Sequence, residues 1–312
     1  MVPLSRIESL KTKLQYLAGA VLFIGLLGFV DYYIGWKRLL APWATLSMGT
    51  LFIAVGLTFV SYWLRAVRLF DYFRADMQGG FTVCFKLMLQ HNLLNNLLPM
   101  RTGELSFPLL MSRYFKVPAN RSVPALLWFR VLDLHTLAAL ALTTAGSHWL
   151  GPRFALIVTV VWMILPWWLF KAGRWLRNKT AVRVEDRLHA RLTRLLDSLP
   201  QGTGEFVRAW VWTALNWITK LAVFAWVMLQ FVDVDAYLAW LGVIAGDLTS
   251  VLPVHGIAGA GTYEAGVAAV LLPFGVPTEE ALQAAVNVHL FILGSTLIGG
   301  LLSLLIPSGF KH

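Results

Sequence analysis

The sequence predicts an all-α integral membrane protein with six transmembrane helices and two re-entrant helical hairpins, arranged as two inverted-topology repeats. Three observations lead to this prediction. Hydrophobic residues make up 58% of the 312 residues and the mean hydropathy is +0.67, whereas soluble domains use roughly 45–50% apolar residues. Six stretches are long and apolar enough to cross a bilayer, and two further apolar stretches share one broken pattern. We therefore expect a single membrane domain over residues 1–312.

The six continuous stretches are predicted to be transmembrane helices, because crossing a hydrocarbon core takes about 20 helical residues. They cover residues 14–35, 41–64, 122–149, 153–171, 205–231 and 279–306. The first stretch is longer than the apolar region of a signal peptide and no cleavage pattern follows it, so we expect it in the mature protein. The single cysteine, Cys84, excludes an intrachain disulfide and a multi-cysteine metal site.

The two broken stretches, residues 81–115 and 236–273, are predicted to form re-entrant hairpins of paired half-helices. Pro, Gly and polar residues interrupt each of them near its middle, at residues 98–104 and 252–264. Non-helical backbone at membrane depth is tolerated only inside the protein or beside a water-filled cavity. Both hairpin tips are therefore expected to face the protein interior.

An ordered set of short motifs relates the two halves of the chain, residues 14–149 and 153–306. Each half contains Leu-Pro, then Thr-x-Glu, then Val-Pro: Leu98-Pro99, Thr102 to Glu104 and Val117-Pro118 in the first, Leu252-Pro253, Thr262 to Glu264 and Val276-Pro277 in the second. Thirteen residues after each Val stands Arg130 or His289. Inverted repeats with broken helices are typical of secondary transporters that bind substrate between the halves.

The distribution of Lys and Arg predicts the orientation. With the N-terminus inside and each hairpin returning to its own side, 19 of these residues are cytoplasmic and three are outside. This count places Arg65 and Arg68 in a cytoplasmic segment. We expect a bacterial-type inner membrane with both termini cytoplasmic. The basic amphipathic segment 172–204 suits a helix on the anionic inner leaflet or a docking face for a cytoplasmic lipid-modifying enzyme.

The hairpin tips carry the first group of candidate site residues. Thr102 and Thr262 are predicted N-caps of the second half-helices, with Glu104 and Glu264 in the first turn. These glutamates either cap the helices only, or stand beside N–H groups that bind a phosphate or carboxylate. In the second case Arg101 and Arg130 add charge-assisted contacts, and tip glycines let a head group approach the backbone.

Polar residues within the apolar stretches form the second group. Interhelical hydrogen bonding explains the amides and histidines about as well as ligand contact does. Arg130 and Asp133 share a helix face, so they either neutralise each other or serve function at a depth where charges are costly. Lys220, Asn216 and Asp247 are expected to be structural partners. The candidate substrate-binding residues are Asn95, Asn96, Arg101, Thr102, Gly103, Glu104, Arg130, Asp133, His255, Gly259, Gly261, Thr262, Glu264 and His289.

Two motifs resemble a known family. The run from Leu98 to Glu104 followed by Arg130-Val131-Leu132-Asp133 resembles the LP-x-R-x-GE … R-x-x-D signature of the flippase-like family typified by the transmembrane domain of bifunctional lysyl-phosphatidylglycerol synthases. The tip from Pro253 to Glu264 is similar to that family's second, glycine-rich motif. The resemblance implies movement of a lipid head group between leaflets. Because no aminoacyl-transferase domain follows the last span, we expect no lysyl transfer.

The function predicted from the sequence is a lipid flippase or scramblase for an anionic phospholipid or a polyprenyl-phosphate-linked head group. No hydrolase, metal or nucleotide motif occurs, so no catalytic residue, cofactor or metal is expected. Membrane lipids are the expected partners and nucleic acid is not. Two alternatives stay open: a membrane transferase acting on a lipid phosphate with Glu104 or His91 as base, and a non-transporting scaffold for a lipid-modifying enzyme.

Overall fold

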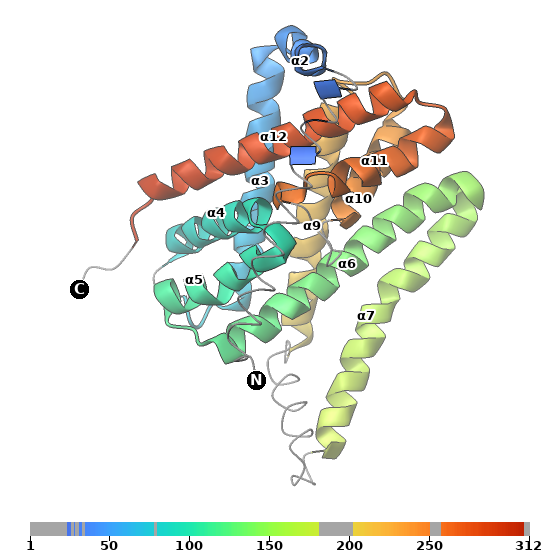
Figure 1. Cartoon of the computed structure of the whole chain (residues 1–312). Coiled ribbons are helices and arrows are strands. Elements are labelled where there is room, and N and C mark those ends of the chain that lie inside the picture. Colours follow the sequence, from blue (N-terminus) through green and yellow to red (C-terminus); the bar gives the residue numbers. More distant parts are fainter. Residues whose placement is uncertain are drawn as a thin grey trace, which may run out of the picture.

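The computed structural model describes residues 35–77, 80–180, 202–249 and 257–308, together with residues 24, 25, 28, 31 and 32. The elements of this described part are helical (Figure 1). The long helices are α3 (Met48–Tyr72), α6 (Ala119–Trp149), α7 (Pro152–Thr180), α9 (Thr203–Met228) and α12 (Thr278–Leu305). The shorter ones are α2 (Trp36–Thr45), α4 (Phe81–Leu97), η1 (Pro99–Leu105), α5 (Ser106–Phe115), α10 (Ala236–Thr249), η2 (Ile257–Gly259), α11 (Thr262–Leu271) and η3 (Leu272–Phe274).

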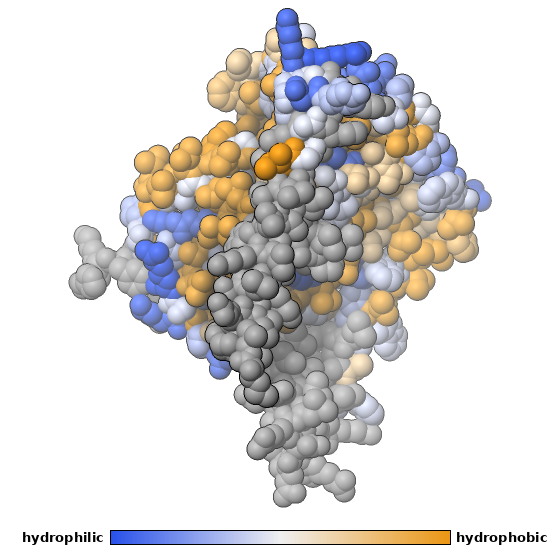
Figure 2. All heavy atoms as spheres, in the orientation of Figure 1, coloured by the Kyte–Doolittle hydropathy of each residue, from blue (hydrophilic) through white to orange (hydrophobic). Residues whose placement is uncertain are grey.

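Four of these helices, α3, α6, α9 and α12, are long and apolar enough to cross a membrane. Their outward faces carry large apolar side chains that a soluble protein would bury, such as Phe52 at 75% exposure and Leu305 at 78%. Figure 2 shows broad hydrophobic areas on the visible face, with hydrophilic residues gathered at the top over α2. This apolar surface is typical of a protein embedded in a lipid bilayer.

Two helical hairpins, α4–η1–α5 and α10–η2–α11, each return to the end of the molecule where they begin. Asp76, which precedes α4, binds Arg121 at the start of α6, so the first hairpin closes at that end. The rings of Tyr237, at the start of α10, and Phe274, after α11, lie 6.4 Å apart. The tips η1 and η2 contact each other between the two hairpins.

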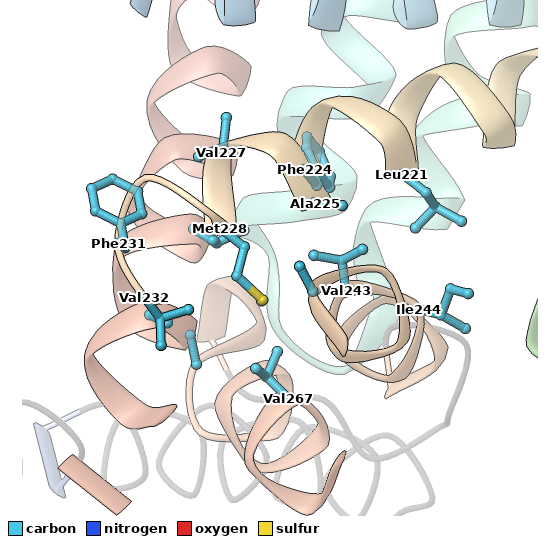
Figure 3. Packing of buried hydrophobic residues seen from close by; sticks show 14 of the residues in the cluster. Leu221, Phe224, Ala225, Val227, Met228, Phe231, Val232, Val243, Ile244 and Val267 are labelled. Carbon is cyan, nitrogen blue, oxygen red and sulfur yellow. The ribbon is translucent and has the colours of Figure 1, made fainter. Parts of the chain in front are cut away.

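Two main apolar cores hold the described helices together. One core joins α3, α4, α5 and α6 around residues such as Leu69, Leu87 and Met111. The other joins α9, α10, α11 and α12, and in Figure 3 Leu221 and Phe224 of α9 lie beside Val243 and Ile244 of α10. Ala54 of α3 and Leu137 of α6 also belong to this second core, so it joins the two halves.

Helices α3 and α9 pack against each other and run antiparallel. Asp71, near the end of α3, binds Arg208, near the start of α9, at 2.8 Å. In the middle of both helices Ser61 donates a hydrogen bond of 2.9 Å to Asn216, 155 residues further along the chain. The hairpins follow directly on α3 and α9, so they enter the molecule from opposite ends.

Hydrogen bonds within α3 recur within α9 between residues that lie 155 positions further along the chain, the separation of Ser61 and Asn216. Thr58 of α3 donates to the carbonyl of Ala54 at 2.9 Å, and Thr213 of α9 donates to the carbonyl of Ala209 at 2.7 Å. The helix packing also pairs up, since α4 contacts α12 and α6 contacts α10. Each of these contacts therefore has a counterpart in the other half.

The structure corrects the predicted span 41–64. The chain forms α2 first and begins a new helix at Met48, where the Ser47 hydroxyl accepts a hydrogen bond from the Thr50 amide. That helix continues to Tyr72, so Arg65 and Arg68 lie on α3 and not in a loop. The sequence pattern ended the span at Arg65 because an unpaired charge is costly in a membrane, but partners on other helices offset that cost.

Other boundaries agree closely, with one extension. Helix α7 runs to Thr180, past the predicted end at residue 171, and takes in the first part of the segment 172–204. The rest of that segment to residue 201 lies outside the described residues, as do most of the first predicted span and residues 250–256 of the second hairpin.

Candidate functional site

A polar cavity lies between the two halves. Its volume is about 1030 Å³, including the part that is open to the outside. Helices α3, α4, α6, α9, α10 and α12 line it together with η2 and α11, so both hairpins contribute. The polar and charged lining residues are Ser61, Tyr62, Arg65, Asn92, Asn95, Asn96, Arg130, Asp133, Lys220, Asp247, Tyr263 and His289.

A buried ionic network at one wall of the cavity centres on Asp133 of α6. Arg68 donates to Asp133 at 2.7 Å and to the Thr213 hydroxyl at 2.8 Å. The Trp217 indole donates to the same Asp133 oxygen at 3.0 Å. Since the Arg68 and Asp133 side chains are only 5% and 2% exposed, this network holds α3, α6 and α9 together without water.

Arg130 binds Glu104 more closely than it binds Asp133. Its Nε lies 3.0 Å from Glu104 Oε1, whereas its Nη1 lies 3.5 Å from Asp133 Oδ2. The helix-neighbour pair expected from the sequence is therefore the weaker contact, because Arg68 takes the near oxygen of Asp133. The closer bond links the first hairpin tip to α6.

The second half contains the corresponding pair. His289 Nδ1 lies 2.7 Å from Glu264 Oε1, and its Nε2 lies 2.8 Å from the carbonyl oxygen of Ala258. The other Glu264 oxygen accepts a hydrogen bond from the Gly261 amide at 2.8 Å. In both halves a glutamate of the tip is thus held by a cationic or titratable residue of the next long helix.

Two further cations face the cavity from α3 and α9. The Arg65 guanidinium donates to the Asn92 side-chain oxygen at 2.7 Å, and in the described part of the chain it forms no ion pair with a carboxylate. Lys220 lies 2.7 Å from an oxygen of Asp247 and 4.6 Å from the centre of the Trp217 ring. Among the described residues, the hydrogen-bond partner of the Arg65 guanidinium is therefore a neutral amide.

The amides predicted from the sequence do line the cavity. Asn96 donates to the Thr296 hydroxyl at 2.9 Å and so ties α4 to α12. The Asn92 side-chain nitrogen and the Asn95 side-chain oxygen have no hydrogen-bond partner among the described residues. His91 is buried and bonds the Ser106 hydroxyl at 2.9 Å within its own hairpin.

The predicted N-caps are wrong in register. Thr102 lies inside η1, which starts at Pro99 and leads straight into α5, so it does not cap that helix. Thr262 is the first residue of α11; Gly261 precedes it and the Thr262 hydroxyl donates to the carbonyl of Gly259.

Gly103 has a different role from the one expected. Its Cα lies so close to α4 that an added Cβ would meet the Leu94 carbonyl group and the Asn95 Cα. The residue therefore allows close packing of the tip on α4 and not the approach of a head group. The Gly261 amide is at the second hairpin tip, where N–H groups were expected to bind a ligand. It donates its hydrogen bond to Glu264 instead.

Sequence reasoning missed Arg65 as a site residue and treated Lys220 and Asp247 as structural only. The signal for Lys220 was present, since a lysine within an apolar span needs a partner. Arg65 gave none, because it follows an apolar run and looks like a loop residue. His255 and the side chain of Arg101 lie outside the described residues.

Comparisons with known proteins place the chain in a family. No curated protein and no solved structure matched it. A family model described as "Lysylphosphatidylglycerol synthase TM region" matches residues 16–300, which include both hairpins and the whole cavity. This match ties the chain to membrane lipid metabolism or transport. The chain belongs to the lysylphosphatidylglycerol synthase transmembrane-region family.

Proposed function

We propose that this protein moves a phosphate-bearing lipid head group between membrane leaflets, as a flippase or scramblase, and leaves the lipid chemically unchanged. The observation that carries the proposal is the position of Arg65. Its guanidinium faces a cavity shared by both halves and contacts a neutral amide where buried arginines are usually paired with a carboxylate. A phosphate would supply the missing anion.

The donors around Arg65 suit a phosphate. A guanidinium forms strong, often bidentate hydrogen bonds to phosphate oxygens. Arg130 lines the same cavity, and the unpartnered Asn92 nitrogen is a further donor. An anionic phospholipid or a polyprenyl-phosphate-linked sugar carries such a group on chains that can remain in lipid. Side-chain donors therefore replace the half-helix N-termini as the proposed anion ligands.

The arrangement of the halves supports transport over binding alone. We propose six transmembrane helices and two re-entrant hairpins in two inverted repeats, 14–149 and 153–306. The antiparallel α3 and α9, the hairpins that enter from opposite ends and the matched Glu104–Arg130 and Glu264–His289 pairs support this topology. Inverted repeats around a central site permit access from each side in turn.

The proposed location is a bacterial-type inner membrane with both termini in the cytoplasm. Arg74, Arg113, Lys116 and Arg121 lie near the end where α3 and α5 finish and α6 begins. With Arg65 and Arg68 moved onto α3, the cytoplasmic surplus of Lys and Arg becomes smaller but keeps its sign.

The test is translocation of fluorescent lipids in proteoliposomes, with phosphatidylglycerol, lysyl-phosphatidylglycerol and a short polyprenyl-phosphate sugar. We expect fast translocation of one of them, reduced at least about tenfold in Arg65→Ala and in Arg130→Ala, since a charge-assisted contact contributes about 1.5–3 kcal/mol. Arg121→Ala is the matched control, because Arg121 is exposed and binds Asp76 away from the cavity. Equal rates in the wild type and both cavity variants would disprove the proposed site, and a covalently altered lipid would indicate a transferase.

A further inference from the structure

The Arg65–Asn92 contact has an exact positional counterpart. Lys220 follows Arg65, and Asp247 follows Asn92, by the same 155 residues that separate Ser61 from Asn216. Both contacts are 2.7 Å long and both join a long helix to the first half-helix of the next hairpin. The two cations line one cavity, one from each half.

The counterparts differ in two respects, the type of cation and the charge of the acceptor. Asn92 is a neutral amide, so the charge on Arg65 is left for a ligand. Asp247 is a carboxylate, so Lys220 is already neutralised, and the pair is mostly buried at 18% and 6% exposure. Asp247 thus supplies to Lys220 the negative charge that a phosphate would supply to Arg65.

We propose that Lys220 is a second phosphate subsite, blocked by Asp247 in this structure, to which the head group passes from Arg65 during translocation. This proposal rests on the proposed function and adds a specific route through the cavity. As the phosphate leaves Arg65 for Lys220, the Asp247 carboxylate leaves Lys220 for the positive charge at Arg65. The phosphate and the Asp247 carboxylate thus swap cationic partners. The net charge of the cavity stays constant, because no charge enters or leaves during the swap.

Physical reasons favour such an exchange over two open subsites. An ammonium is more compact and more strongly hydrated than a guanidinium, so leaving Lys220 without an anion in this cavity costs more than leaving Arg65 without one. Two open cations would also hold one phosphate too tightly for release, because both would contact it at once. One open and one blocked subsite keeps a single phosphate moving between equivalent positions.

Polar groups from several helices line the cavity that the exchange would cross. Tyr62, from α3, and Tyr263, from α11, line the cavity together with both cations and carry hydroxyl groups that can donate to either anion. His289 of α12 lines it as well but is held by Glu264 and Ala258. A displaced Asp247 carboxylate therefore stays among polar groups.

The experiment exchanges the two acceptors. Affinity for dihexanoyl-phosphatidylglycerol and, separately, for inorganic phosphate is measured by titration calorimetry in detergent for the full chain, Asn92→Asp, Asp247→Asn and the double variant N92D/D247N. We expect N92D to weaken binding about tenfold, D247N to strengthen it about tenfold, and the double variant to return to within about threefold of the wild type. Asp76→Asn is the matched control, since Asp76 pairs with Arg121 at the exposed end.

Several outcomes would overturn the proposal. If D247N binds no more tightly than the wild type while remaining folded, or if the double variant binds as weakly as N92D, Lys220 is not a latent subsite. Binding of inorganic phosphate with the same pattern but no binding of the lipid would place the subsites in a free-phosphate route and overturn the lipid route. Binding of neither probe to the wild type or to D247N would reject both subsites.

A second variant tests whether the Lys220–Asp247 pair is a phosphate subsite or only a structural ion pair, referred to here as a clamp. Its folding does not depend on whether the protein tolerates a lysine without an anion. Lys220→Met with Asp247→Asn removes both charges and keeps the packing volume similar. We expect it to bind phosphatidylglycerol at Arg65 within about threefold of the wild type but to translocate it at least about tenfold more slowly. Unchanged translocation would make the pair a clamp only. If the wild type translocates no lipid, the proposed function fails, whereas the binding series still decides whether Lys220 accepts phosphate.

Discussion

The Ser61 hydroxyl donates a hydrogen bond of 2.9 Å to the Asn216 side-chain oxygen, and each residue is the other's counterpart, 155 positions apart. Both are 1% exposed and lie midway along antiparallel helices. We expect Ser61→Ala to lower the free energy of unfolding by about 1 kcal/mol, because the buried amide oxygen loses its donor. Thermal unfolding in detergent measures this loss.

A hydroxyl removed elsewhere is the control for that variant. Thr144 donates to the Leu140 carbonyl of its own helix at 2.8 Å, so Thr144→Ala leaves the contacts between helices intact. We expect its effect to stay within about 0.5 kcal/mol. Equal losses in the two variants would mean that the α3–α9 bond contributes nothing specific.

The network around Asp133 predicts a much larger loss of stability. Asp133→Asn removes the carboxylate that accepts from Arg68 and Trp217 and leaves the Arg68 charge buried. Breaking a buried ion pair in this way costs about 3–5 kcal/mol. The expected result is little folded protein by size-exclusion chromatography and a strongly lowered unfolding temperature.

The exposed pair between Asp71 and Arg208 provides the comparison. Its side chains are 22% and 52% exposed, so Asp71→Asn should cost less than about 1 kcal/mol. A folded Asp133→Asn protein as stable as Asp71→Asn would show that the buried network is not needed for the fold.

The close packing of Gly103 on α4 leads us to expect a steric clash when a larger residue replaces this glycine at the first hairpin tip. In Gly103→Ala the new Cβ would lie 2.6 Å from the Leu94 carbonyl carbon, which belongs to the backbone and cannot turn aside. We expect a loss of about 1–3 kcal/mol from overpacking, measured by thermal unfolding. Gly294→Ala on α12 is the matched control, because a Cβ there meets no atom within 4 Å and alanine favours a helix. A neutral Gly103→Ala would rule out this close packing.

The Glu264–His289 pair leads us to expect that a second substitution restores the stability lost in the first. Glu264 is 3% exposed, so His289→Ala leaves its carboxylate buried with the Gly261 amide as the one remaining donor among the described residues. We expect a loss of about 3–5 kcal/mol, most of which is recovered when Glu264→Gln removes the charge in the same chain. Thermal unfolding of the single and double variants tests this. Failure of the second change to restore stability would mean that His289 acts through packing alone.

Much of the fold could be predicted because it depends on local properties of the chain. The length of an apolar run sets where a helix can span lipid, and Pro and Gly break helices at the hairpin tips whatever surrounds them. The predicted hairpin at residues 81–115 matches α4, η1 and α5 to the residue at both ends. Glu104, Glu264, Arg130 and His289 were also singled out, since charged and titratable groups in apolar runs are rare enough to notice.

The predictions of charge pairing failed because they depended on partners far away in the chain, whereas the predicted N-caps failed at local turns of the hairpin tips. Arg65 and Arg68 looked like the start of a loop, yet Arg68 is buried because Asp133 and Thr213 reach it from α6 and α9. Thr102 and Thr262 looked like caps, but the real turns begin earlier.

The sequence alone determined the class of protein, the places of its long helices and hairpins and the order of its tip motifs, because hydropathy, helix breaking and turn formation act between residues close in the chain. Only the tertiary structure decided which charges are paired. In that structure Arg68 pairs with Asp133, Arg130 with Glu104 and Lys220 with Asp247, whereas Arg65 donates to the Asn92 amide oxygen. The physical reason is that the cost of a buried charge depends on what lies within a few ångströms, and here the groups that lie there come from other helices.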